Sequence, residues 1–198
     1  MICLAVISCD SSNTGLSNTS SSKSEASNST QPDKTSLNSK VILYTKTQLE
    51  SVLPKRLGVL KRSKMSVIER PNGLQAKSLY LSNDAKPKSI KINLFDLSKF
   101  KGDKSQIQIY GQINSGIFNQ IDEKKSDRFT RSEKISGYPA VIEETSVEMF
   151  GEEYKDSKLA ILFDHRLYVE MEGSRLTVKE LQSVVRYLNL KLLPSWNF

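Results

Sequence analysis

Strict alternation of apolar and polar residues constrains the fold of this chain more than any other feature of its sequence. It is clearest in KLAILFDHRLYVEMEG, residues 158–173, where Asp164-His165 separates two alternating runs. Side chains that alternate with a period of two cover one face of a β-strand. A short polar break between two such runs is typical of a hairpin. The stretch therefore predicts an antiparallel β-hairpin.

Five other stretches carry enough of this alternation to predict strands of their own. Turn residues separate them: Pro71-Asn72-Gly73 follows the first, and NDAKPK, residues 83–88, divides the second from the third and predicts another hairpin. Pro139 predicts that the fifth strand begins at a sheet edge or at a bulge. The five stretches are 64–71, 74–82, 88–97, 127–135 and 137–145.

Three stretches carry helical patterns instead. Thr47 is placed to cap a short helix that Pro54 ends. Apolar residues at helical spacing predict a second helix over 105–123. Thr177 and Glu180 form a capping box at the start of a third helix. The apolar stripe of that third helix consists of Val178, Leu181, Val184, Val185 and Leu188.

The order of these elements fits the α+β class, because strands and helices do not alternate as they do in a parallel α/β sheet. We expect a mainly antiparallel sheet of about six to seven strands with helices packed on one face, including the C-terminal amphipathic helix. Residues 40–198 form a single globular domain in this interpretation. A domain of that size buries about two-thirds of the surface that its unfolded chain exposes.

The N-terminal residues have a different composition. Residues 10–39 are rich in serine and asparagine and nearly free of apolar residues, so they predict a disordered tether. Its root-mean-square reach is about 30 Å. Cys3 and Cys9 are the only cysteines, which excludes a disulfide scaffold and a cysteine-based zinc site from the domain.

Residues 1–9 predict the end of a signal peptide, because eight mostly apolar residues precede Cys9 and are too few to span a membrane. The stretch Val6-Ile7-Ser8-Cys9 resembles a bacterial lipobox. That resemblance implies that Cys9 receives the lipid and becomes the mature N-terminus. The stretch departs from the preferred pattern at Val6 and Ser8. A simple secretion signal and an apolar N-terminal strand are the alternatives.

Several short stretches of the domain are similar to a group of uncharacterised bacterial exported lipoproteins. They are INLFD at 92–96, GYPA at 137–140, FDHRLYVEMEG at 163–173 and LNLKLL at 188–193. The resemblance implies an α+β domain behind a lipid anchor, exported to the periplasmic face or the outer surface of the cell envelope. It implies no activity, because the group has none assigned.

Positive charge is concentrated in the first part of the domain. Residues 40–70 contain eight Lys or Arg against two Glu, a net charge of +6 in a chain whose formal net charge is +7. Such a cluster can bind an anionic surface or polymer, and a solvated protein face is the alternative. An exported protein does not meet nucleic acid, so we expect none as a partner. The densest basic residues are Lys55, Arg56, Lys61, Arg62 and Lys64.

Two groups of residues are candidates for catalysis. His165, between Asp164 and Arg166, could act as a general base beside an anion clamp, but a polar turn explains the three residues equally. Six carboxylates between 143 and 156 could hydrolyse glycosides or bind calcium, or form a solvated acidic loop. These six are Glu143, Glu144, Glu148, Glu152, Glu153 and Asp156.

The sequence therefore predicts a membrane-anchored envelope lipoprotein with a binding or structural role rather than an enzyme. We expect no metal and no cofactor. The membrane is the first partner, through the lipid on Cys9, and an envelope protein, a host protein or an anionic polymer is the second. The oligomeric state stays open. The alternatives are an exported hydrolase that uses the acidic 143–156 region and an adhesin for anionic polymers.

Overall fold

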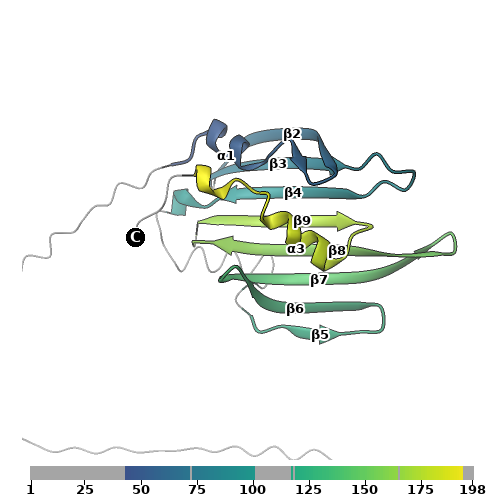
Figure 1. Cartoon of the computed structure of the whole chain (residues 1–198). Helices are drawn as coiled ribbons and strands as arrows, with labels where there is room; N and C mark the ends of the chain where they lie inside the picture. Colours follow the sequence, from purple (N-terminus) through teal and green to yellow (C-terminus); the bar gives the residue numbers. More distant parts are fainter. Residues whose placement is uncertain (1–42, 72, 101–116, 118, 165, 194–198) are drawn as a thin grey trace, which may run out of the picture. The chain divides into compact units, whose positions relative to one another are not determined.

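Nine strands form one antiparallel sheet in the computed structural model, which describes residues 43–71, 73–100, 117, 119–164 and 166–193. The strand order is β1-β2-β3-β4-β9-β8-β7-β6-β5 (Figure 1). The strands are β1 (Arg56–Leu57), β2 (Leu60–Arg70), β3 (Gly73–Leu81), β4 (Ser89–Asp96), β5 (Asp122–Lys124), β6 (Arg128–Ile135), β7 (Tyr138–Met149), β8 (Glu152–Phe163) and β9 (Leu167–Ser174).

The antiparallel sheet confirms the α+β class, but its nine strands correct the expected six to seven. All seven stretches with alternating residues form strands. The two additional strands, β1 and β5, have only two and three residues. A strand of that length is too short to show alternation, so the sequence carried no signal for either of them.

The first helix, α1 (Lys46–Val52), begins two residues earlier than expected. Thr45 rather than Thr47 is its N-cap, and Thr45 and Gln48 form a reciprocal capping box. Leu49 and Val52 are buried, as their spacing predicted.

The C-terminal helix, α3 (Val178–Val185), has the expected capping box between Thr177 and Glu180. The apolar stripe is buried along the helix, and Leu188 is buried just beyond its end. Two short 3-10 helices, η1 (Ser98–Phe100) and η2 (Leu190–Leu192), follow β4 and α3. No helix among the described residues is long and apolar enough to cross a membrane.

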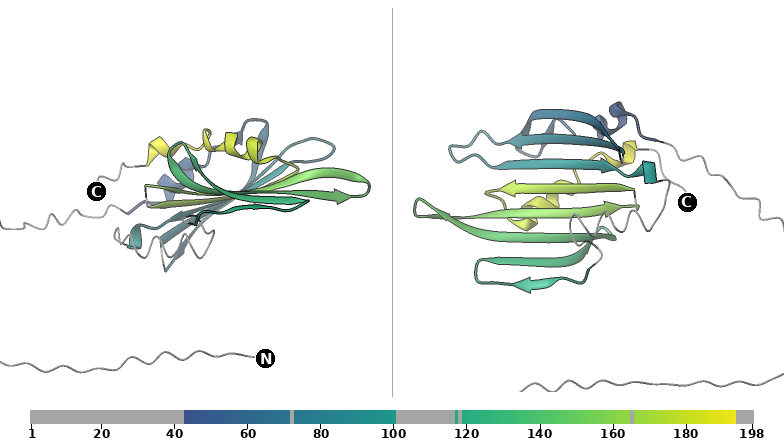
Figure 2. Two further views of the ribbon diagram at one scale, coloured as in Figure 1. Left: turned by 90° about the horizontal axis from the view of Figure 1, so that it is seen from below. Right: turned by 180° about the vertical axis from the view of Figure 1, so that it is seen from behind.

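Both helices pack on the same face of the sheet (Figure 2). The main hydrophobic core lies between them and the central strands, where Leu49 and Leu181 join Ile92, Ile161 and Val169. All five of these side chains are completely buried. This face is called the helix face below. The inward-pointing side chains of each alternating strand lie on it.

The opposite face, called the open face below, is apolar at one end and polar at the other. A second core cluster, which includes Leu162, Tyr168 and Ile117, covers its apolar end. At the other end the outward side chains of β4, β9, β8 and β7 are polar or charged except for Val147. Of the helix predicted over 105–123, only residues 117 and 119–123 are described. They are not helical, and Asp122 and Glu123 begin strand β5 instead, which corrects the prediction at this end.

Pro139 does not mark a bulge, but it lies where only one side of its strand is paired. Strand β7 pairs with β6 from Tyr138 onward, whereas its pairing with β8 begins at Ala140. A proline that close to the start of a strand costs little, because the ladder has barely begun.

Candidate functional site

Four of the five residues of the predicted basic cluster are exposed, and the fifth, Arg62, is not. Lys55, Arg56, Lys61 and Lys64 are exposed around the β1–β2 turn. Arg62 has a structural role instead: its guanidinium donates to the Leu53 carbonyl at 2.6 Å and contacts the Met65 sulfur at 2.8 Å. Arg62 is therefore not a free cation for ligand binding, which corrects the prediction for this residue. Cys9 and residues 10–39 lie outside the described residues and stay predictions.

The acidic residues do not form a loop. They lie on β7 and β8, which make one long hairpin through the turn at Phe150-Gly151. Glu143 lies on the open face and pairs with Lys158 at 3.5 Å. Glu144, one residue further along β7, accepts the backbone N–H of Val178 at 2.8 Å, at the start of α3. Neighbouring carboxylates thus project to opposite faces of the sheet, and the six do not share one site.

The carboxylates near the hairpin turn have cationic partners. Glu152 pairs with Lys86 and lies 3.9 Å from Arg175. Glu153 pairs with Lys155 at 3.0 Å. The hydrogen bond and the charge of Lys86 lower the pKa of Glu152 from its ordinary value. These exposed pairs neutralise the end of the hairpin but do not build a catalytic pair.

Arg166 is not the anion clamp that the Asp164-His165-Arg166 stretch suggested. Its guanidinium is buried, donates to the Asp96 carboxylate at 3.2 Å and lies 3.3 Å from the centre of the Tyr44 ring. The same carboxylate accepts the Ser98 backbone N–H at 3.0 Å and its hydroxyl at 2.7 Å. Arg166 therefore joins the β8–β9 turn to the end of β4. His165 lies outside the described residues.

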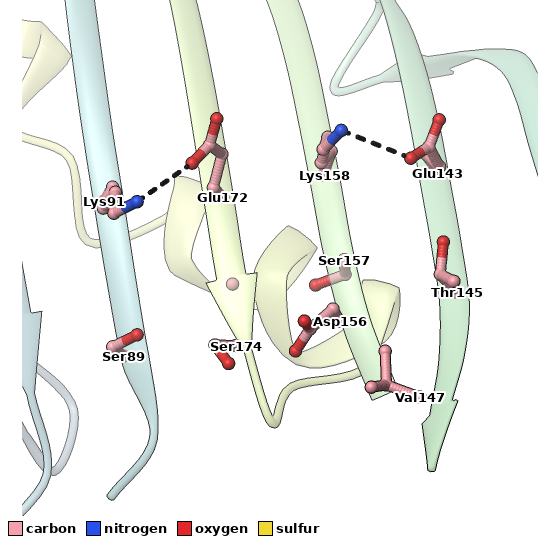
Figure 3. A pocket seen from close by; sticks show the side chains of 11 residues that line it. Ser89, Lys91, Glu143, Thr145, Val147, Asp156, Ser157, Lys158, Glu172 and Ser174 are labelled. Atoms are coloured by element: carbon pink, nitrogen blue, oxygen red, sulfur yellow. Dashed lines mark ion pairs between the residues drawn. The ribbon is translucent and has the colours of Figure 1, made fainter. Parts of the chain in front are cut away.

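A groove of about 460 Å³ lies on the polar end of the open face. The strand register aligns four charged residues in one row across β4, β9, β8 and β7: Lys91, Glu172, Lys158 and Glu143. Lys91 pairs with Glu172 and Lys158 with Glu143, each at 3.5 Å (Figure 3).

A second row of polar residues follows, two residues further along each strand. It consists of Ser89, Ser174, Asp156 and Thr145. Asp156 accepts the Arg175 backbone N–H at 3.1 Å. Among the described residues, the side-chain hydroxyls of Ser89, Ser174 and Thr145 have no hydrogen-bond partner. The groove (Figure 3) therefore presents three hydroxyls and a carboxylate next to paired charges.

A neighbouring hollow of about 330 Å³ shares Glu143, Lys158 and Glu172 with the groove and adds Glu170. Burial raises the pKa of Glu170; its hydrogen bond from the Tyr168 hydroxyl, at 3.0 Å, opposes the rise. The charge of nearby Glu172 adds to the rise. The net effect is a pKa for Glu170 above the ordinary value of a glutamate.

Sequence reasoning missed the groove for a physical reason. The residues of its two polar rows occupy outward positions of alternating strands, where polar residues are ordinary. Only the pairing of β4 with β9, about eighty positions apart in the chain, brings Lys91 beside Glu172. No three His, Cys, Asp or Glu side chains in the described part of the chain are placed to share a metal ion.

Comparisons with known proteins identify no relative. No protein-family model, no curated protein and no solved structure matches this chain.

Proposed function

We propose that this chain is a lipid-anchored protein of the bacterial envelope whose domain serves as a binding module. The lipobox-like residues Val6-Ile7-Ser8 ahead of Cys9 support the anchor, and the serine-rich segment 10–39 behind it supports a tether. The domain at the end of that tether would then face the periplasm or the exterior, at a distance set by the tether's reach of about 30 Å.

The binding site of this module is the open-face groove. The observation that carries the assignment is the row of unpartnered hydroxyls, Ser89, Ser174 and Thr145, beside Asp156. Hydroxyls and carboxylates on a rigid sheet bind ligands that bring hydroxyl or amide groups of their own. Because the adjacent charges neutralise each other in pairs, the groove favours an uncharged ligand. An oligosaccharide is the ligand class that fits this chemistry best.

A titration with neutral oligosaccharides tests the groove. Maltohexaose and an N-acetylglucosamine hexamer, added to the isotope-labelled chain, are expected to shift amide resonances of β4, β7, β8 and β9 around Thr145 and Ser174. The double variant Ser89→Ala/Thr145→Val keeps the shape and removes two hydroxyls, so affinity is expected to fall about tenfold, or roughly 0.7 kcal/mol for each hydrogen bond lost. Ser66→Ala, an exposed serine on β2, is the control. Resonance shifts that are absent, or spread evenly over the domain, would contradict the assignment.

A hydrolase is the second candidate. The observation that favours it is the raised pKa of Glu170, which lines a hollow with two other carboxylates. Glycoside hydrolysis uses a carboxyl group with a raised pKa as general acid beside an ionised carboxylate. Burial raises the pKa of Glu170, and Glu143 and Glu172 line the same hollow. Cleavage of either hexamer during the titration, abolished by Glu170→Gln, would favour the hydrolase over the binding module.

A further inference from the structure

Two turns with exposed apolar residues lie at the same end of the sheet. Neighbouring strands are antiparallel throughout, so the β1–β2 and β7–β8 turns fall at the same end as the β3–β4 turn. Figure 1 shows the β7–β8 hairpin extending beyond the other strands at that end. Four strand spacings separate β2 from β8, which is roughly 19 Å at about 4.8 Å per strand.

The β7–β8 turn exposes two large apolar residues that the fold does not require. Phe150 is 98% exposed and Met149 is 47% exposed. Phe150 also has a φ of 54°, and Gly151 follows with a φ of 76°. Asn-Gly is the favoured pair in such a turn, and a bulky residue with positive φ is strained. A strained and fully exposed phenylalanine therefore points to a contact outside the domain.

The β1–β2 turn combines an exposed apolar residue with the basic cluster. Val59 is 83% exposed at the tip of the turn. The exposed residues Lys55, Arg56 and Lys61 flank it, and Lys64 follows on β2. The other strongly exposed apolar residues, Leu43 and Leu192, lie close to chain outside the described residues, so their exposure carries no argument.

The charges beside Phe150 do not oppose an anionic partner as strongly as the sequence suggests. Glu152 pairs with Lys86, and Glu153 pairs with Lys155. Arg175 lies 3.9 Å from Glu152 and adds a further positive charge. Glu148 is the one carboxylate of this turn region without an ion pair among the described residues.

We propose that this end of the domain docks onto an anionic lipid bilayer. Phe150, Met149 and Val59 enter the interface between headgroups and acyl chains, and the lysines of the β1–β2 turn contact anionic headgroups. A bilayer fits better than a protein pocket because the apolar side chains lie on two separate turns, whose strands β2 and β8 are about 19 Å apart, with the lysines around only one of them.

This inference rests on the proposed location at a membrane but not on the lipid anchor or on the groove. Docking at this end would hold the domain against the surface to which its tether is attached.

Co-sedimentation with vesicles tests the proposal. Residues 9–198 with Cys9→Ser, which have no lipid, are mixed with phosphatidylcholine vesicles with or without 30 mol% phosphatidylserine. We expect binding only with phosphatidylserine, and a loss of at least fivefold on raising salt from 0.05 M to 0.5 M, because the screening length falls below about 5 Å. Lys55→Gln/Lys61→Gln/Lys64→Gln is expected to weaken binding at least tenfold. Lys46→Gln/Lys134→Gln/Lys191→Gln, three exposed lysines away from the two turns, is the matched control and keeps binding.

The apolar contribution has its own variant. Phe150→Asn is expected to weaken vesicle binding at least threefold while the thermal midpoint rises or stays unchanged, because asparagine suits the positive φ. This separates a lost contact from a damaged fold. Equal binding by the two lysine variants, or unchanged binding by Phe150→Asn, would overturn the proposal. Binding to heparin with none to vesicles would also overturn it, in favour of an anionic polymer as the partner. None of these results bears on the lipidation of Cys9 or on the groove.

Discussion

Replacing Asp96 with alanine is expected to lower the free energy of unfolding by about 3–5 kcal/mol, the cost of leaving one charge of a buried ion pair without its partner. The side chains of Asp96 and Arg166 are 2% and 3% exposed, so water cannot replace the lost carboxylate. Removal would also orphan the Ser98 hydroxyl and backbone N–H that Asp96 accepts. Urea denaturation of the variant and of the parent chain measures the difference.

Two controls separate this buried pair from an ordinary one. Glu172→Ala breaks the pair with Lys91, whose side chains are 51% and 67% exposed, and should cost less than about 1 kcal/mol. The double variant Asp96→Leu/Arg166→Met removes both buried charges and should recover part of the loss of Asp96→Ala. Similar losses of unfolding free energy from Asp96→Ala and Glu172→Ala would show that the buried pair stabilises the fold no more than the exposed pair does.

Replacing Gly73 with alanine is expected to cost roughly 3–5 kcal/mol, from overpacking against the backbone and from a strained φ. A Cβ at Gly73 would lie 1.8 Å from the backbone oxygen of Asp96, which cannot move without disturbing β4. The φ of Gly73 is 138°, which side-chain-bearing residues rarely adopt. The thermal and urea midpoints of Gly73→Ala measure the loss.

Gly137 provides the matched control for Gly73. Its φ is 88°, but nothing lies within 4 Å of a Cβ built there. Gly137→Ala therefore isolates the conformational cost, about 1–2 kcal/mol. If the two alanine variants lose the same stability, the close approach of Gly73 to Asp96 does not matter.

The long strands were predictable because their alternation is strong and local. The residues from Leu159 to Met171 form β8 and β9 as expected, and the capping box at Thr177 begins α3. The β7–β8 extension was not predicted, because residues 146–153 contain three glutamates and alternate only over the short stretch from Ser146 to Met149. Such a segment is held in an extended conformation by its pairing with a neighbouring strand. The strand propensity of its own residues does not predict that pairing.

Charged residues show the limit of sequence reasoning about sites. Arg62 and Arg166 were grouped with solvent-exposed charges, yet one binds the Leu53 carbonyl and the other is buried against Asp96. Their roles depend on which face of a strand they occupy and on partners up to seventy residues away. The groove depends on register in the same way, since Glu143 and Lys91 share a row only through two intervening strands.

The lipid on Cys9 is the central claim of this account, and labelling with radioactive palmitate measures it most directly. The chain is expressed in bacteria with a complete signal peptide ahead of Val6, beside the Cys9→Ser variant. The parent chain is expected to carry the label, to remain with membranes after a high-salt wash and to begin at Cys9 by mass spectrometry. The variant is expected to carry no label and to leave the membrane fraction. Label that persists in Cys9→Ser, or a parent chain that retains residues 1–8 without label, would contradict the claim.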